Sequence, residues 1–154
     1  MCEQIRLRKA LAADYVEICT WVTDAATCRQ WAGPSIVFPL HADLLQADLT
    51  KDGQESFSLV NGERVVAFGQ YWTIEPEAVH IGRVIVSPRC RDKGIGRHFV
   101  EALIARAMDS TGAVRVTLRV ASGNGRAQTL YESMGFQPVA GRSGADVLFM
   151  QRCK

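Results

Sequence analysis

Alternation of apolar and polar residues is the clearest regularity in the chain. Ile5 and Leu7 alternate with arginines at the start, which predicts a half-buried strand. Two β-rich runs are joined at Asn61-Gly62, a dipeptide typical of a tight hairpin turn. We expect strands at residues 4–10, in two runs within 56–72, and at 78–86, 114–120 and 146–150. In the run at 114–120 the residues expected to face inward are Val114, Val116, Leu118 and Val120.

Apolar residues spaced three and four apart predict helices between these strands. Asp14 and Glu17 stand at the spacing of a capping box, which places a helix start there. Gly135 stands where a left-handed residue ends a helix. Trp31 falls in a stretch with a glycine and two prolines, which we expect to be a loop. The expected helices cover residues 13–22, 41–49, 95–107 and 124–134.

The order β-α-α-β-β-β-α-β-α-β mixes hairpins with crossover connections and predicts an α/β fold with a mixed sheet. The 154 residues suit one domain, residues 1–154, with a sizeable core. A formal charge of +2 and the lack of a basic run give no indication of nucleic acid. No apolar run is long enough to span a membrane, and no signal peptide is evident.

Cysteines are scattered and odd in number, with no CxxC pair and no cluster with histidine at zinc spacing. We therefore expect reduced thiols, no metal site and a cytoplasmic protein. The five are Cys2, Cys19, Cys28, Cys90 and Cys153.

The turn at residues 91–97 connects the strand at 78–86 to a helix and contains Gly94 and Gly96. It lacks the lysine of a P-loop, and Phe99 stands where a dinucleotide fingerprint needs its third glycine. Arg-x-x-Gly-x-Gly at a helix start can bind an anion, because free backbone N–H groups and the positive end of the helix dipole lie there. A glycine-containing turn without any ligand is the alternative.

Two motifs in the right order resemble the GNAT superfamily of acyl-CoA-dependent N-acyltransferases. "VIVSPRCRDKGIG" is similar to its motif A, and "NGRAQTLYESMGF" is similar to its motif B. The resemblance covers residues 5–150 in element order and is specific over residues 80–136. It implies a mixed, mostly antiparallel sheet of six to seven strands, flanked by about four helices, with splayed central strands.

The resemblance also implies acetyl-CoA as cosubstrate. Its pantetheine would follow the strand, where backbone N–H groups polarise the thioester carbonyl. Asn124 would approach the pantetheine as well as cap its helix. The cofactor-binding residues implied are Val84, Ile85, Val86, Arg91, Asp92, Lys93, Gly94, Ile95, Gly96, Arg97, Asn124 and Tyr131.

Catalysis needs an acid for the leaving thiolate and a base for the amine. The resemblance assigns the acid to Tyr131, although its position on the apolar stripe also suits a core tyrosine. Many GNAT members carry a glutamate where His80 stands. Histidine titrates near neutrality and can act directly or through water, but a structural histidine is equally compatible. Glu75, Glu77 or an ordered water are the other candidates for the base.

Trp31, Tyr71 and Trp72 are the aromatic candidates for the acceptor pocket, and packing over the sheet explains them equally well. The function expected is transfer of an acetyl group to a primary amine by direct attack in a ternary complex. The acceptor would be a small molecule or a peptide, and the protein a monomer or homodimer. The alternative is a non-catalytic acyl-CoA-binding module that acts as a sensor or interaction domain. A phosphotransferase is disfavoured, because the P-loop lysine is missing.

Overall fold

A computed structural model describes residues 4–51 and 53–154 of the chain. Their contacts form two compact units, which we describe separately. The first unit comprises the described residues up to Gln70 together with Arg83–Leu103. The second unit comprises Tyr71–Gly82 and Ile104–Lys154. The strands of the described residues form one seven-stranded sheet with the order β1-β2-β3-β4-β5-β7-β6.

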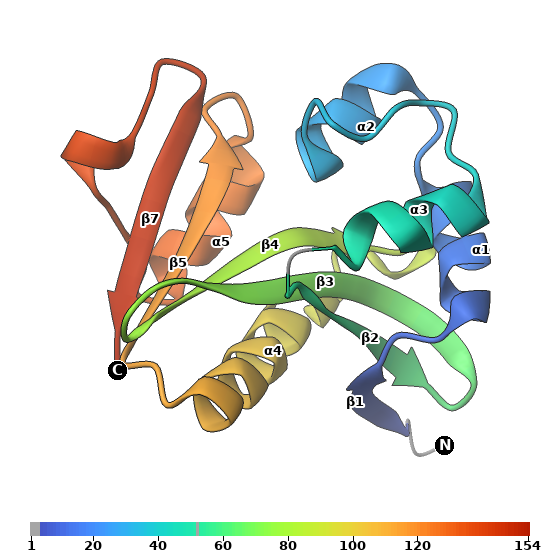
Figure 1. The fold of residues 1–154 in the computed structure, drawn as a ribbon, viewed down its shortest axis with the longest axis horizontal. Helices are drawn as coiled ribbons and strands as arrows, with labels where there is room; N and C mark the ends of the chain where they lie inside the picture. Colours follow the sequence, from blue (N-terminus) through green and yellow to red (C-terminus); the bar gives the residue numbers. More distant parts are fainter. Residues whose placement is uncertain (1–3, 52) are drawn as a thin grey trace. The chain divides into compact units, whose positions relative to one another are not determined.

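The elements follow one another along the chain as shown in Figure 1. The helices are α1 (Ala12–Trp21), α2 (Ala25–Ala32), α3 (Ala42–Leu49), α4 (Ile95–Thr111) and α5 (Gly125–Ser133), with short 3₁₀ turns at Pro88–Cys90 and Ala140–Arg142. The strands are β1 (Ile5–Lys9), β2 (Glu55–Asn61), β3 (Arg64–Glu75), β4 (Ala78–Val86), β5 (Arg115–Ala121), β6 (Gln137–Pro138) and β7 (Val147–Cys153).

Helices cover both faces of the strands in the first unit. Successive residues of a strand point to opposite faces, and Phe68 and Gly69 of β3 show this alternation. The Phe68 ring packs edge-on against Tyr15 of α1, with 5.5 Å between ring centroids. A Cβ on Gly69 would lie 2.7 Å from Cε2 of Phe99 in α4, so only glycine fits there. Helices α1 to α3 therefore cover one face and the start of α4 covers the other (Figure 1).

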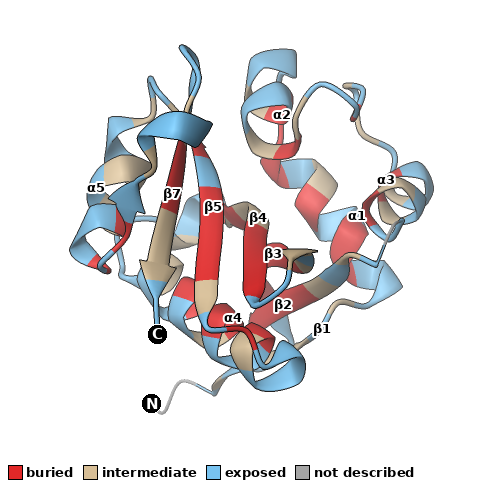
Figure 2. Cartoon of the chain, turned by 60° about the vertical axis from the view of Figure 1, so that its left-hand side comes forward, coloured by how far each residue is buried: buried red, intermediate tan, exposed pale blue. Residues whose placement is uncertain are grey.

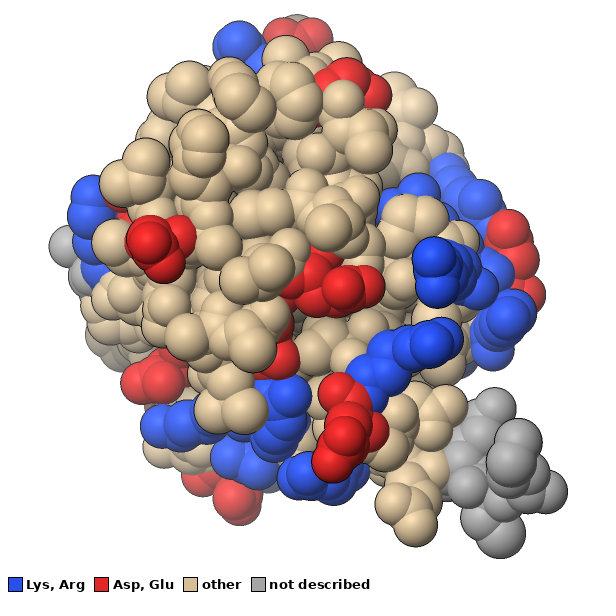
Figure 3. Space-filling view, turned by 90° about the vertical axis from the view of Figure 1, so that its right-hand side faces the viewer, with Lys and Arg blue, Asp and Glu red and all other residues tan. Residues whose placement is uncertain are grey.

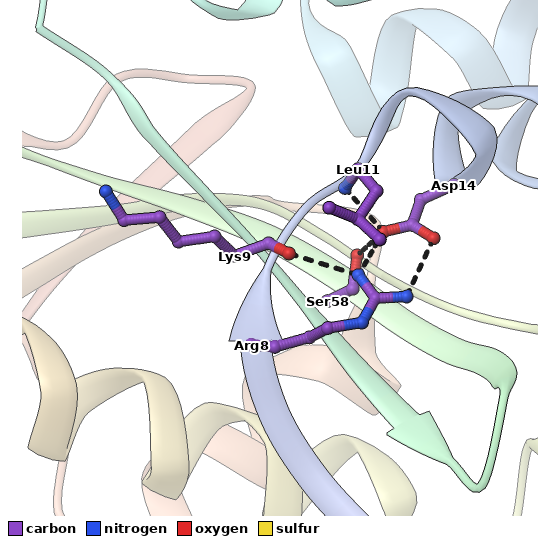
Figure 4. A network of polar contacts seen from close by, with 5 residues as sticks. All are labelled: Arg8, Lys9, Leu11, Asp14 and Ser58. Atoms are coloured by element: carbon purple, nitrogen blue, oxygen red, sulfur yellow. Dashed lines mark hydrogen bonds and ion pairs between the residues drawn. The ribbon is translucent and has the colours of Figure 1, made fainter.

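A buried carboxylate fixes the start of α1, as Figure 4 shows. Asp14 is only 4% exposed and accepts hydrogen bonds from the backbone N–H of Leu11, at 2.8 Å, and from the Ser58 hydroxyl. Both oxygens also accept from the guanidinium of Arg8 in β1, at 2.6 and 3.1 Å. Asp14 is thus the third residue of α1 and Leu11 is the N-cap, so the predicted position of the cap was wrong by three residues.

The prediction of a loop around Trp31 was also wrong, because Trp31 lies in α2. Asp24 caps this helix by accepting the backbone N–H of Thr27 at 2.7 Å. The helix is short and buries only Cys28 and Ala32, so its apolar stripe is too sparse for periodicity to reveal it.

β5 is central in the second unit. It pairs in parallel with β4, from Ala78 opposite Arg115 to Ile81 opposite Leu118, although both strands continue further. The splayed central strands that the resemblance implies stay a prediction. On its other side β5 pairs antiparallel with β7 over its whole length, and β6 borders β7. Figure 2 shows β5 buried along most of its length.

The predicted fold class, an α/β fold with a mixed sheet of six to seven strands, is confirmed. The described residues form five helices where about four were expected, because α2 was missed. Val114 was predicted to face inward, but it precedes β5 and is 43% exposed. Gly135 has the predicted left-handed conformation, with φ of 93°, and follows Met134, the C-cap of α5. The single domain over residues 1–154 stays a prediction.

Candidate active site

The glycine turn of the first unit is exposed from Arg91 to Gly94. Gly94 has φ of 79°, and a Cβ there would meet nothing within 4 Å, so the turn needs glycine for its conformation and its surroundings are open. At the start of α4, the N–H of His98 donates to the carbonyl of Gly94, the residue before the helix, at 3.1 Å. The N–H groups of Ile95 and Gly96 precede it and have no acceptor inside the helix. This is the geometry predicted for an anion site.

The last residues of β4, Val84–Val86, lead directly towards this turn in the same unit. Arg91 folds back on the strand, and its Nε donates to the carbonyl of Val86 at 3.2 Å. Arg83, which sequence reasoning missed, has φ of 52° inside the strand. A left-handed residue other than glycine is uncommon and requires support from its surroundings.

Arg83 receives that support from α2 and β3. The indole Nε1 of Trp31 donates to the Arg83 carbonyl at 2.7 Å. The Arg83 guanidinium donates to Oε1 of Gln70 at 2.9 Å and to the carbonyl of Ala32 at 3.4 Å. Burial lowers the pKa of this guanidinium from its ordinary value of 12.5. Trp31, predicted to contact the acceptor, therefore lies in α2 and binds the backbone of β4.

His80 lies in the second unit and is 3% exposed. Its Nδ1 is 2.7 Å from Oγ1 of Thr117 in β5. The imidazole lies 5.0 Å from the Trp72 ring and 6.0 Å from the Phe149 ring, centroid to centroid. The structure thus brings together two predicted site residues, His80 and Trp72, in an aromatic environment with one hydroxyl.

Tyr131 and Asn124 belong to α5 in the same unit. Oδ1 of Asn124 accepts the backbone N–H of Ala127 at 3.2 Å, so the predicted helix cap is confirmed. The Tyr131 ring is 8% exposed and packs edge-on against Phe136, with 5.8 Å between centroids. Burial raises the pKa of Tyr131 to about 12. The phenol therefore stays protonated at neutral pH, as an acid must.

The other candidates in the second unit differ in exposure. Tyr71 is buried, and Trp72 is half-buried over Gly82, where a Cβ would lie 2.5 Å from its ring. One oxygen of Glu75 binds both Arg115 and Arg142, at 3.2 and 3.0 Å. Two guanidinium groups therefore already share this carboxylate, which makes it a weaker candidate for a base.

A surface hollow of 840 Å³ lies in the first unit, between α1, the β2–β3 hairpin and the 3₁₀ turn after β4. Its charged lining residues are Asp14, Glu17, Glu63, Arg64 and Arg89. Figure 3 shows side chains of both signs on the face of the molecule that it draws. A mixed surface of this kind does not indicate a polyanionic partner. None of the predicted site residues lines the hollow.

The remaining features of the described residues concern metal-ligating side chains, long apolar helices and thiols. Within residues 4–51 and 53–154 no three metal-ligating side chains gather at one place, and no helix is long and apolar enough to cross a membrane. Burial raises the pKa of the Cys19 and Cys28 thiols. Cys90 and Cys153 form no disulfide either, and Cys2 lies outside the described residues.

Comparison with known proteins identifies the sequence over most of its length. The family model described as "Acetyltransferase (GNAT) family" matches residues 16–136. The matched segment contains β4, the glycine turn and α5.

Solved structures with the same fold include two that are named as acetyltransferases and one domain whose name states no activity. A chimera of the spermidine N-acetyltransferase SpeG from Vibrio cholerae and hSSAT aligns with a TM-score of 0.74 and 17% identity, covering 97% of this chain and 95% of that one. AAC(6')-Ib in complex with paromomycin and acetyl-CoA aligns with a TM-score of 0.77 and 14% identity, covering 97% of this chain and 93% of that one. A domain from Methanocaldococcus jannaschii aligns with a TM-score of 0.79 and 18% identity, covering 99% and 100%.

Proposed function

Because the chain belongs to the GNAT family of acetyltransferases, we propose that it transfers an acetyl group from acetyl-CoA to a primary amine by direct attack in a ternary complex. The observation that carries the proposal is the family match over residues 16–136, which includes an exposed glycine turn at the start of α4. The turn offers backbone N–H groups at the positive end of a 17-residue helix.

Acetyl-CoA would bind with its pyrophosphate on the backbone of residues 91–97. Its pantetheine would run along Val84–Val86. Asn124, in the second unit, is a further proposed cofactor-binding residue. A backbone N–H of this strand would donate to the thioester oxygen, where negative charge develops as the amine attacks. The open space around Gly94 supports this placement.

Bond making and bond breaking require two proton transfers. The neutral amine nitrogen attacks the thioester carbon, the C–N bond forms, and the C–S bond then breaks to release a thiolate. Tyr131 would give its phenolic proton to the thiolate and so form free CoA. The buried, protonated phenol of Tyr131 supports that role. The second proton transfer takes the proton of the attacking amine to a general base.

His80 is the base that we propose, because an imidazole accepts protons at neutral pH. Its contact with the Thr117 hydroxyl orients the ring. Its burial means that the amine, or a water in contact with it, would have to reach the ring from the acceptor side. Glu75, Glu77 and an ordered water remain the other candidates.

The acceptor that we propose is a small-molecule or peptide amine. Among proteins with this fold, one is named as a spermidine and another as an aminoglycoside acetyltransferase. Tyr71 and Trp72 would present aromatic surface to a cationic amine. We further propose that the protein is a monomer or a homodimer. We also propose that it acts in the cytoplasm, where scattered cysteines in odd number stay reduced.

A panel of primary amines, each assayed for free CoA released from acetyl-CoA, tests the proposed function. Polyamines, aminoglycosides, amino acids and short peptides should be compared at one pH, with hydrolysis in the absence of amine subtracted. At least one class should give turnover. Binding of acetyl-CoA without turnover for any amine would instead support the sensor or interaction module.

A further inference from the structure

The peptide group between Arg83 and Val84 is held in place at its oxygen. The Arg83 carbonyl accepts the indole N–H of Trp31 at 2.7 Å. A peptide group is planar and trans, so its C=O and N–H point in opposite directions. Any contact that fixes the Arg83 carbonyl therefore also fixes the direction of the Val84 N–H, and accepting a hydrogen bond makes that N–H a better donor.

Arg83 cannot hold this orientation by its own conformational preference. Its φ of 52° lies in the left-handed region, which is unfavourable for a residue other than glycine. Three contacts oppose that cost, and all lie in the first unit. They are the Trp31 hydrogen bond and the guanidinium contacts with Gln70 and Ala32.

Trp31 is itself held firmly enough to act as an anchor. It lies in α2, whose first turn is capped by Asp24. Its ring packs edge-on against Phe68 of β3, with 6.3 Å between centroids. Both ends of the Trp31–Arg83 contact are therefore tied to the packed core of the first unit.

We propose that Trp31 is a positioning residue, which orients the Val84 N–H so that it donates to the thioester oxygen of acetyl-CoA. The inference rests on the proposed function, since it assigns a donor for that reaction. It differs from a role for Trp31 as a wall of the acceptor pocket. A pocket wall acts on the KM of the acceptor, whereas an oriented donor acts on the transition state and so on kcat.

Trp31→Phe tests the proposal, because it keeps an aromatic ring against Phe68 and deletes the N–H. The matched control is Trp21→Phe, which removes another indole hydrogen bond of the same unit, donated to Glu17 at 3.3 Å. The first readout is the infrared carbonyl stretch of bound acetyl-CoA labelled with ¹³C at the thioester carbon. A hydrogen bond to that oxygen lowers the frequency below that of free acetyl-CoA.

We expect a lowered frequency in the wild type and in Trp21→Phe, and a return towards the free value in Trp31→Phe. With a working acceptor, kcat of Trp31→Phe should fall about tenfold or more, with a smaller change in the acceptor KM. If Trp31→Phe does not fold, 3-benzothienylalanine at position 31, which has sulfur in place of the N–H, takes its place.

A wild-type frequency retained in Trp31→Phe, or a change in acceptor KM alone, would overturn the inference and leave the proposed function intact. Acetyl-CoA bound with no lowered frequency in the wild type would also overturn it, because no donor would then act on the oxygen. Absence of acetyl-CoA binding to the folded wild type would instead refute the proposed function itself. The outcomes therefore distinguish the two failures.

Discussion

At the scale of single residues, Tyr131 combines burial with a hydroxyl that stays protonated. Its pKa of about 12 follows from desolvation, which disfavours the phenolate. A phenol with so high a pKa is a weak acid, so contact with the bound substrate must favour the transfer of its proton to the thiolate. Phe136 packs against its ring, so the side chain also contributes to the core whether or not it acts in catalysis.

Tyr131→Phe separates the two roles, because it keeps the ring and removes the proton. We expect kcat to fall about ten- to a thousand-fold with little change in the affinity for acetyl-CoA, as for the loss of a general acid. Tyr15→Phe is the control, since it also takes a hydroxyl from a buried tyrosine, in the first unit. Steady-state rates and calorimetric binding measure the effects. Wild-type turnover in folded Tyr131→Phe would assign Tyr131 to the core alone.

His80 predicts a dependence of rate on pH. If the neutral imidazole is the base, kcat/KM rises with pH as His80 loses its proton, and His80→Gln lacks that rising limb. The loss should shrink at high pH, where more of the free amine is deprotonated. Profiles of kcat/KM against pH for both proteins, with His41→Gln as an exposed control, provide the measurement. Superimposable profiles would point to Glu75, Glu77 or water.

At the scale of elements, the carboxylate of Asp14 joins α1 to β1 and β2. Burial raises the pKa of Asp14, but the hydrogen bonds from Arg8, Leu11 and Ser58 together lower it by more. The pKa of Asp14 therefore lies below its ordinary value of 3.8. A carboxyl group with a lowered folded pKa stabilises the fold above its unfolded pKa. This stabilisation is lost as the pH falls through the folded pKa.

Asp14→Asn should therefore reduce the free energy of unfolding at pH 7 by about 1–3 kcal/mol, since a charged acceptor of buried hydrogen bonds is lost. The difference between wild type and variant should shrink as the pH falls below 3.8. Urea unfolding at pH 7 and at pH 3 measures both effects. Asp48→Asn, which removes an exposed ion pair with Lys51, should change stability by less than about 1 kcal/mol. Equal losses at pH 7 would contradict the role assigned to Asp14.

At the scale of the whole molecule, local patterns predicted most elements but not the contacts between distant segments. The turn at Asn61-Gly62, β4 and α4 each carry a strong periodic or turn signal and were found as predicted. β6 has two residues and no period to detect. The positive φ of Arg83 depends on Trp31, which is distant in sequence, so no local pattern reveals it. For the same reason the sequence revealed candidates for the site but not their partners.

Acetyl-CoA should raise the melting temperature, because a ligand that binds only the folded state stabilises it by mass action. At a concentration one hundred times its Kd, the gain is about 2.7 kcal/mol, or about 5–11 °C for a chain of this size. NADH and ATP should do much less.

Gly96→Val should abolish the shift, since its side chain would cover N–H groups at the start of α4, while helix propensity changes little. Gly141→Val, at a glycine with open surroundings, is the control. Thermal shifts across an acetyl-CoA titration measure the effect, and wild-type binding by folded Gly96→Val would remove the pyrophosphate from this turn.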